Sequence, residues 1–165
     1  MYDILIVEQA YREKPNLIKH FYITNSEKIK NNKLFISTMQ KLDIVNNKIA
    51  TFESRFRMPY FLDKYTDVVI AHQVENPLNY AYLDALYLNY PLVHNASLIK
   101  DAGYYYDGFD VETGKNMLLY ALEQHDKNIE EYNNNSKNVL NRYMYNNEDT
   151  VIKYDELIDN LFKNK

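Results

Sequence analysis

Polar side chains gather in one short stretch between two apolar segments near the middle of the sequence. Before an expected helix lie His72, Gln73, Glu75, Asn76 and Asn79, and after it lie His94 and Asn95. A hydrophobic core does not need so many hydrogen-bonding groups, because each one costs free energy to bury unless it finds a partner. A polar ligand does need them, and we therefore expect a binding site here.

The helix expected over residues 76–89 has the pattern of an anion site. Asn76 is a favoured N-cap residue, and Pro77 suits the first helical position. Asn76, Tyr80 and Asp84 are spaced four apart, so they follow one helical face. The helix N-terminus suits a phosphate, and Asp84 would then hold an attached hydroxyl group such as a ribose. Alternatively, Asn76 is only a cap and Asp84 a solvated helix residue.

Three basic residues follow expected strands at the same edge of the sheet. Arg55 and Arg57 come after the third expected strand, and Lys14 comes after the first. An arginine can bind a diphosphate through paired donors. Alternatively, the arginines are surface residues that pair with Glu53 or Asp63, and Lys14 is a surface lysine.

Glu75 and His94 also have structural explanations. A glutamate just before an N-cap is common because the helix field favours it. A single histidine at the end of a strand, such as His94, is more often a hydrogen-bonded core residue than a catalytic one. The sequence leaves both alternatives open.

Strands alternate with helices over the first 110 residues. The expected strands are 3–8, 33–38, 48–53, 67–72, 92–96 and 104–106, and the expected helices are 15–30, 58–65, 76–89 and 97–103. Helical segments at 111–125, 127–144 and 147–163 form a tail on this core. The alternation predicts one α/β domain over residues 1–165, a Rossmann-like parallel sheet of about six strands flanked by helices. Ligands of such sheets lie beyond the carboxyl ends of the strands, where the polar residues fall.

Composition narrows the function classes. The net charge of −4 and the pI near 5.6 argue against a nucleic-acid-binding module. The chain has no Cys, and its four His have no metal-ligand spacing, so we expect no metal site. There is no apolar run long enough to span a membrane, and we expect a cytoplasmic protein. GxGxxG, Walker A and GxSxG motifs are also absent.

A longer stretch resembles a known family. "IATFESRFRMPYFLDKYTDVVIAHQVENPLNYAYLDALYLNYPLVHNA" (49–96) resembles the nucleotide-sugar donor-binding half of GT-B glycosyltransferases. Together with "GYYYDGFD" (103–110), it is similar to a little-characterised bacterial and viral glycosyltransferase-like branch. In that branch an "EN-x-LNY-x-YL" turn and helix precedes "PLVHN" and "GYYY". The match covers residues 49–110, and the rest agrees only in pattern.

The resemblance implies metal-independent transfer of a sugar from a nucleotide-sugar to a glycan, lipid or protein acceptor, with no further cofactor. Asp84 would bind the ribose, while Glu75, Asn76 and Asn79 would meet the sugar and the diphosphate. Arg57 or Arg55, with Lys14, would neutralise the departing diphosphate. Glu75 and Arg57 are the catalytic candidates, and the remaining donor-binding candidates are Gln73, Tyr80, His94 and Asn95.

The sequence also departs from the family pattern. Asp84 stands where the family has Glu, and Asn89 replaces a glycine at the helix end, which a left-handed Asn tolerates. GT-B enzymes have two domains, so we expect that an N-terminal GT-B domain lies in a longer protein, that a partner supplies the acceptor domain, or that activity has been lost. The alternative function is a non-catalytic interaction module that retains the Rossmann-like fold, with its tyrosines and helical tail serving a partner surface. A nucleotide- or methyl-donor-binding enzyme of another kind would lack its usual glycine-rich turn.

Overall fold

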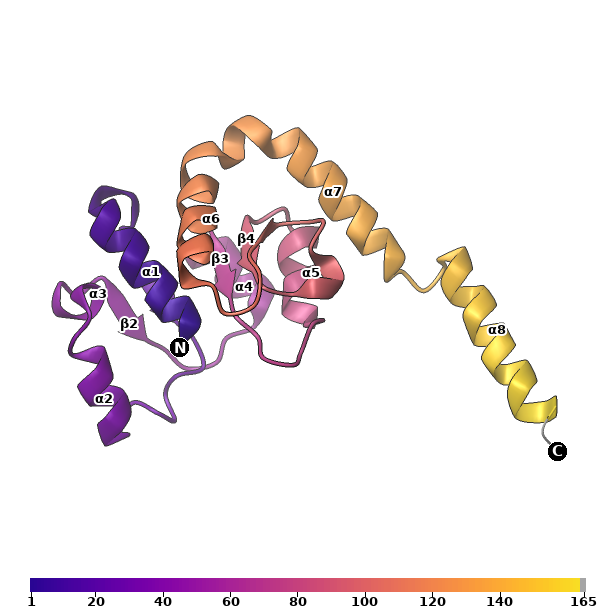
Figure 1. Cartoon of the computed structure of the whole chain (residues 1–165), viewed down its shortest axis with the longest axis horizontal. Helices are drawn as coiled ribbons and strands as arrows, with labels where there is room; N and C mark the ends of the chain where they lie inside the picture. The colour runs from indigo at the N-terminus through magenta and orange to yellow at the C-terminus, as the bar shows by residue number, and fades with distance from the viewer. Residues whose placement is uncertain (164–165) are drawn as a thin grey trace.

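The computed structural model describes residues 1–163 and has an α/β body with a helical tail (Figure 1). In chain order the elements are α1 (Tyr2–Glu13), η1 (Pro15–Leu17), β1 (Phe21–Ile23), α2 (Lys33–Met39), α3 (Asp43–Asn46), β2 (Ala50–Phe52), α4 (Met58–Tyr65), β3 (Val69–Ala71), α5 (Tyr80–Tyr87), β4 (Leu92–His94), η2 (Ser97–Ile99), β5 (Tyr104–Tyr105), α6 (Val111–Gln124), η3 (His125–Asn128), α7 (Ile129–Arg142) and α8 (Glu148–Lys163). The η elements are single 3-10 turns.

The strands form two small parallel sheets. β1 pairs with β2, with Phe21 opposite Ala50, and the second sheet has the order β3-β4-β5. In the second sheet Val69 lies opposite Leu92 and Val93 opposite Tyr104. The parallel direction and the α/β class are confirmed, but the single sheet of about six strands is wrong.

The N-terminal third holds most of the differences from the sequence prediction. Residues 3–8, expected as a strand, lie in α1, and residues 33–38, also expected as a strand, lie in α2. The segment expected as a helix over 15–30 instead contains β1. A short apolar run fits a buried helix as well as a buried strand, so periodicity alone cannot separate them.

Contacts on two sides explain why α1 is so apolar. Ile4, Ile6, Val7 and Ala10 are all buried, because α1 packs against both α6 and α3. In α2 the deciding signal is the cap, since Asn32 Oδ1 accepts a hydrogen bond from Phe35 N at 3.1 Å. Both helices therefore have local or tertiary support that a strand assignment overlooks.

The remainder of the chain follows the prediction more closely. Five elements lie within the segments expected for them: β2 in 48–53, α4 in 58–65, β3 in 67–72, β4 in 92–96 and β5 in 104–106. The three C-terminal helices are present as α6, α7 and α8. Residues 97–103, expected as a short helix, form only the single turn η2.

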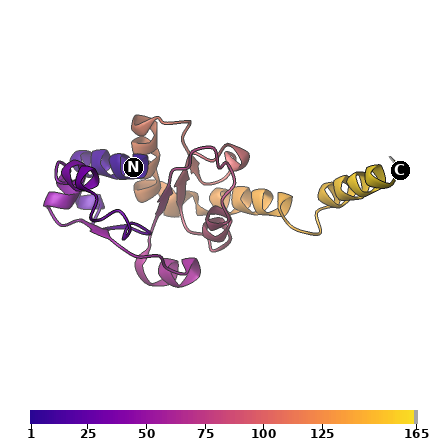
Figure 2. The ribbon, with the colours of Figure 1, turned by 90° about the horizontal axis from the view of Figure 1, so that it is seen from below.

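The tail leaves the body of the molecule. α7 packs against α5, whereas α8 projects beyond it, as two perpendicular views show (Figure 1 and Figure 2). Every side chain of α8 that the structure describes is exposed except that of Thr150, which is half-buried. Within residues 1–163, no helix combines the length and the apolar character needed to cross a membrane.

Candidate functional site

The three strands of the second sheet end at a common edge. Because β3, β4 and β5 are parallel, the residues that follow them are brought together. Asn95, just after β4, binds Gln73, just after β3, with both of its amide atoms. Asn95 Oδ1 accepts from Gln73 N at 2.9 Å, and Asn95 Nδ2 donates to Gln73 O at 2.8 Å. The edge predicted from sequence therefore exists, and Asn95 holds it together.

His94 is a core residue of this edge. Its side chain is fully buried, its Nδ1 accepts from Ala96 N at 3.1 Å, and its Nε2 donates to Ala102 O at 2.8 Å. Burial lowers the pKa of His94 from 6.5 to about 4, so the ring is neutral at pH 7. With both nitrogens bound to backbone, His94 has none left for a ligand and positions the turn after β4.

His72 lies in an aromatic setting that the sequence did not indicate. Its ring centroid is 4.6 Å from that of Tyr2 and 5.1 Å from that of Phe109, and its Nδ1 lies 3.0 Å from Tyr106 Oη. Its Nε2 is buried and has no hydrogen-bond partner among residues 1–163. Partial burial lowers the pKa of His72. Tyr2 was missed because its segment was expected to be a strand.

The helix that follows β3 starts later than expected. α5 begins at Tyr80, and its N-cap is Asn79 rather than Asn76. Asn79 Oδ1 accepts from Ala81 N at 3.0 Å, and Asn79 O accepts from Tyr82 N at 2.9 Å. Asn76 is exposed in the preceding loop. The expected helix over 76–89 and its Asn76 cap are corrected accordingly, because the Asn79 side chain supplies the better-placed cap.

Glu75 has an unusual backbone conformation. Its φ is +53°, in the left-handed region that residues other than Gly rarely adopt, and its side chain is exposed. Such a conformation costs about 1 kcal/mol or more and is concentrated at functional positions. The φ value places the strain at the turn that joins β3 to α5.

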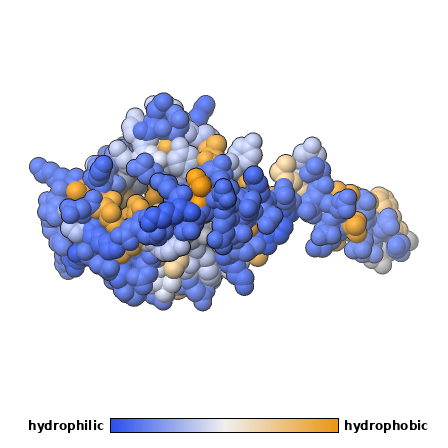
Figure 3. Space-filling view, turned by 90° about the horizontal axis from the view of Figure 1, so that it is seen from above, coloured by the Kyte–Doolittle hydropathy of each residue, from blue (hydrophilic) through white to orange (hydrophobic). Residues whose placement is uncertain are grey.

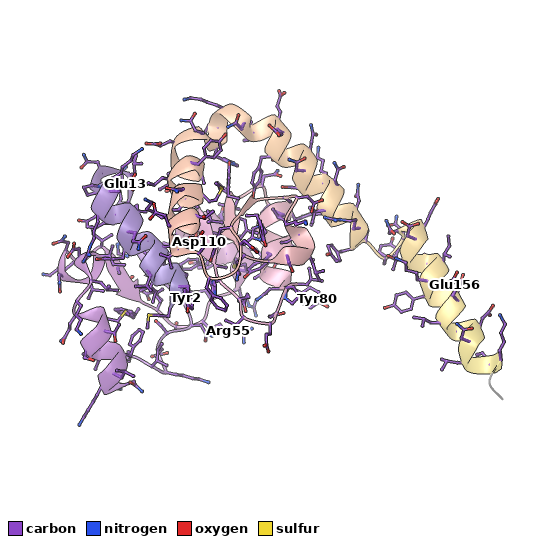
Figure 4. The ribbon with its side chains drawn as sticks, viewed as in Figure 1. Tyr2, Glu13, Arg55, Tyr80, Asp110 and Glu156 are labelled. Atoms are coloured by element: carbon purple, nitrogen blue, oxygen red, sulfur yellow. The ribbon has the colours of Figure 1, made fainter. Side chains whose placement is uncertain are left out.

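Tyr80 and Asp84 lie one turn apart on α5, and both are exposed. Tyr80 is 83% exposed, which is unusual for a tyrosine on the body of the molecule. Figure 4 shows Tyr80 on the same side of the molecule as Arg55 in this view. Two of the three residues expected on one helical face are therefore open to solvent together, and the third, Asn76, lies before the helix.

The basic residues divide into two groups. Arg55 and Arg57 are exposed between β2 and α4, and within residues 1–163 neither makes a hydrogen bond or ion pair through its side chain. The expected alternative pairing with Glu53 or Asp63 does not form. α4 packs against α5, which keeps this connection on the α5 side of the molecule.

Lys14 lies at a different place in the fold from Arg55 and Arg57. It caps the C-terminus of α1, and its Nζ lies 2.6 Å from Glu123 Oε1 on α6. Its neighbour Glu13 lies at the far end of α1 from Tyr2, away from Tyr80 and Arg55 in Figure 4. The structure does not bring Lys14 to the other sequence-predicted residues, because the segment before it is a helix and not a strand.

Two cavities lie away from these residues. One of about 410 Å³ lies at the junction of α7 and α8, and one of about 150 Å³ is lined by Tyr104, Tyr120 and Tyr132. The sequence-predicted residues line neither of them. Among residues 1–163, no group of three or more His, Asp or Glu side chains is arranged to hold a metal ion.

Comparison with known proteins gives one match. No curated protein and no solved structure matches the chain. Residues 1–158 match a family described as "Protein of unknown function (DUF2827)". That match extends from α1 into α8, and the chain therefore belongs to the DUF2827 family.

Proposed function

We propose that this chain is the nucleotide-sugar-binding half of a metal-independent glycosyltransferase of the GT-B type. Two independent lines support the proposal. One is the resemblance of residues 49–110 to GT-B donor-binding sequences. The other is that Gln73 and Glu75 lie on the connection that follows β3 at the carboxyl edge of a parallel sheet, and that Tyr80 and Asp84 lie on α5, which follows this connection. The two small sheets would form part of a Rossmann-like domain.

The observation that carries the proposal is the strained Glu75 turn immediately before α5. A glutamate with φ +53° is held there against its own preference, and its carboxylate has no hydrogen-bond or ion-pair partner within residues 1–163. Glu75 would accept hydrogen bonds from hydroxyl groups of the donor sugar. Asp84 would do the same for the ribose, since it lies on the exposed face that starts at Tyr80.

The diphosphate would be held mainly by side chains rather than by the helix N-terminus. Asn79 already occupies Ala81 N and Tyr82 N, so few α5 donors remain for an anion. Within residues 1–163 the side chains of Arg55 and Arg57 have no partner, and Arg57 is the N-cap residue of α4, which packs on α5. Their guanidinium groups would stabilise the negative charge that develops on the leaving diphosphate.

In the transfer step the bond between the sugar C1 and the diphosphate oxygen breaks, and a bond from C1 to an acceptor oxygen forms. The nucleoside diphosphate leaves with the bonding electrons, and the acceptor proton passes to a base. A second GT-B domain, on a longer polypeptide or a partner chain, would supply the acceptor site. We propose that the reaction takes place in the cytoplasm on a glycan, lipid or protein acceptor.

Calorimetric titration with a panel of nucleotides and nucleotide-sugars, with and without Mg²⁺, tests the proposal. We expect millimolar or tighter binding that does not require the metal and that is lost in Asp84→Ala and Arg57→Ala. Asp155→Ala and Lys137→Ala, which remove exposed charges on α8 and α7, are the matched controls and should bind normally. Absence of binding by every nucleotide tested would overturn the proposal.

The second candidate is a non-catalytic interaction module that retains the fold. The exposed apolar side chains of α8 favour it, since they have no partner in the body of the molecule. The same titration separates the two candidates, because a module of this kind would bind no nucleotide.

A further inference from the structure

α8 is an amphipathic helix, and within the described residues 1–163 its apolar face is exposed. Its apolar residues recur at intervals of three and four, as on one side of a helix: Val151, Tyr154, Leu157, Ile158, Leu161 and Phe162. Leu161 and Phe162 are each 71% exposed and Leu157 is 61% exposed. Figure 3 shows apolar side chains exposed among the hydrophilic ones on this tail. In proteins most helical stability comes from packing of the amphipathic face, so α8 would gain stability from a partner surface.

The polar face of α8 indicates the charge of that partner. It carries five acidic residues and two lysines, and one of the lysines, Lys163, lies 3.8 Å from Asp159 on the same helix. A helix that binds an anionic membrane surface has the opposite composition, with lysine and arginine on its polar face. The α8 face therefore fits a protein surface that is apolar and basic.

The same chain exposes a surface of that kind. The aromatic patch, as we call it, consists of rings from β1, α4 and the segments that precede them: His20, Tyr22, Phe56, Tyr60, Phe61 and Tyr65. Their centroids form a chain of contacts: Phe56 lies 4.8 Å from Phe61, and Tyr65 lies 5.4 Å from Phe61 and 6.4 Å from Tyr60.

The aromatic patch is open and positively charged at its edge. Tyr60 is 56% exposed and Tyr65 is 48% exposed. Arg55 and Arg57 flank Phe56 in the sequence and have no side-chain partner within residues 1–163. Phe61, which joins Phe56 to Tyr65, is buried, and the exposed rings of the patch are Phe56, Tyr60 and Tyr65. A group of exposed apolar side chains marks an interaction site, and arginines are favoured at such interfaces.

We propose that α8 of one copy packs its apolar face on the aromatic patch of a second copy, and that the two copies exchange these helices to form a closed dimer. α8 projects from the body, so the exchange needs no rearrangement of the fold (Figure 1). The acidic flank of α8 then faces Arg55 and Arg57. In a reciprocal exchange the α8 helices and the aromatic patches of both copies are all covered. A one-way contact would leave one α8 and one aromatic patch exposed, and further copies could add to them to form a filament.

The size of the contact is close to the lower limit for a specific dimer. A helix of sixteen residues is roughly 24 Å long and about 10 Å wide with its side chains, so one face covers about 240 Å². Two such contacts, counted on both partners, bury about 1,000 Å², which is near the smallest area that a specific interface buries. Pairing of α8 with α8 is the competing arrangement, but it brings two acidic helices together. The proposal holds for either candidate function.

Sedimentation velocity of the full chain over a range of concentrations tests the proposal. We expect a dimer for the wild type. Leu157→Asp with Leu161→Asp removes the α8 face, and Tyr60→Asp with Arg55→Glu alters the patch. Each double variant should be monomeric across the same range.

The matched controls introduce the same kind of substitution, to Asp, at positions outside the two proposed contact surfaces. Ile152→Asp lies off the apolar face of α8, and Tyr87→Asp alters an exposed tyrosine of α5 outside the patch. Both should remain dimeric, and circular dichroism should show that every variant is folded.

Mixing the two monomeric variants gives the decisive result. One retains an intact patch and the other an intact α8, so a mixed dimer with one native contact should form. The proposal is overturned by a monomeric wild type, by a patch variant that stays dimeric (α8 pairing with α8), or by an α8 variant that stays dimeric.

Discussion

Asn95 and Gln73 are joined by two hydrogen bonds, with N–O distances of 2.9 Å and 2.8 Å, between the side-chain amide of the first and the backbone of the second. This pair holds the carboxyl end of β3 against that of β4. In Asn95→Asp the carboxylate can still accept from Gln73 N but cannot donate to Gln73 O, and two oxygens then face each other. We expect a loss of about 1–3 kcal/mol in the free energy of unfolding, measured by urea denaturation.

The same variant should loosen the connection to α5. Hydrogen exchange at residues 73–79 should become faster in Asn95→Asp, while exchange in the α1–α6 pair stays unchanged. Asn76→Asp makes the same chemical change at an exposed position and is the control. Equal exchange in the two variants would contradict the role of Asn95 as the tie between strands.

The edge of the second sheet was predictable because its signals are local. Pro91 and the apolar run after it indicated β4, and polar residues directly follow β3 and β4 in sequence. Asn89 at the end of α5 has φ +60°, which confirms that a left-handed Asn replaces the expected glycine.

The N-terminal third was not predictable in the same way. The run at 3–8 is apolar because α1 packs against α6, a helix more than a hundred residues later in the chain. Glu8 is buried there because its carboxylate accepts from Asp43 N and Ile44 N at 2.9 and 3.0 Å, capping α3. Such long-range contacts leave no trace in local periodicity, and the position of Lys14 was wrong as a consequence.

The start of α5 was misplaced for a different reason. Asn76-Pro77 and Asn79-Tyr80 are both acceptable helix starts, and sequence spacing does not choose between them. The structure chooses Asn79, whose side chain reaches Ala81 N.

Glu75→Gly should separate stability from donor binding. Glycine adopts φ +53° without steric cost, so the variant should unfold at higher urea, gaining about 1 kcal/mol. If Glu75 contacts the donor sugar, the same variant should bind nucleotide-sugars more weakly in calorimetry. Glu75→Ala is the control, because it loses the carboxylate but keeps the strained backbone and should bind weakly with no gain in stability.

Gly114 and Ile6 form the close contact between α6 and α1. A Cβ at position 114 would lie 2.9 Å from Ile6 Cγ1 and closer still to Ile6 Cδ1. Gly114→Ala gains up to about 1 kcal/mol in helix propensity but should lose about 1–3 kcal/mol to this clash, giving a net loss. Ile6→Val removes the Cδ1 atom and should recover part of that loss in the double variant, as thermal unfolding would show.

Asn116→Ala is the control for propensity on the same helix. Asn116 is exposed, so its replacement should raise stability by a few tenths of a kcal/mol. A Gly114→Ala variant as stable as Asn116→Ala would show that the helices do not approach this closely.

The buried His94 makes stability depend on pH. Its pKa is lowered from 6.5 to about 4 in the folded state, so between these values the unfolded chain binds a proton that the folded chain does not. The contribution of His94 to the free energy of unfolding is therefore fully present above pH 6.5 and is lost as the pH drops from 6.5 to 4. Below pH 4 this residue causes little further change. The full difference is about 3 kcal/mol. The pKa values of His72 and His125, also lowered by burial, add to the loss in the same direction.

Urea denaturation of the wild type at a series of pH values measures this slope. His94→Gln should be less stable than the wild type at pH 7, because Gln cannot reproduce both backbone hydrogen bonds. It should also lose less stability between pH 6.5 and 4, because the titrating group is absent. Asn76→Gln alters an exposed side chain that does not titrate, so it should retain the wild-type slope. If His94→Gln and Asn76→Gln show the same pH dependence, His94 is not the buried neutral histidine that holds the β4 turn, because a proton that both states take up equally leaves the free energy of unfolding unchanged.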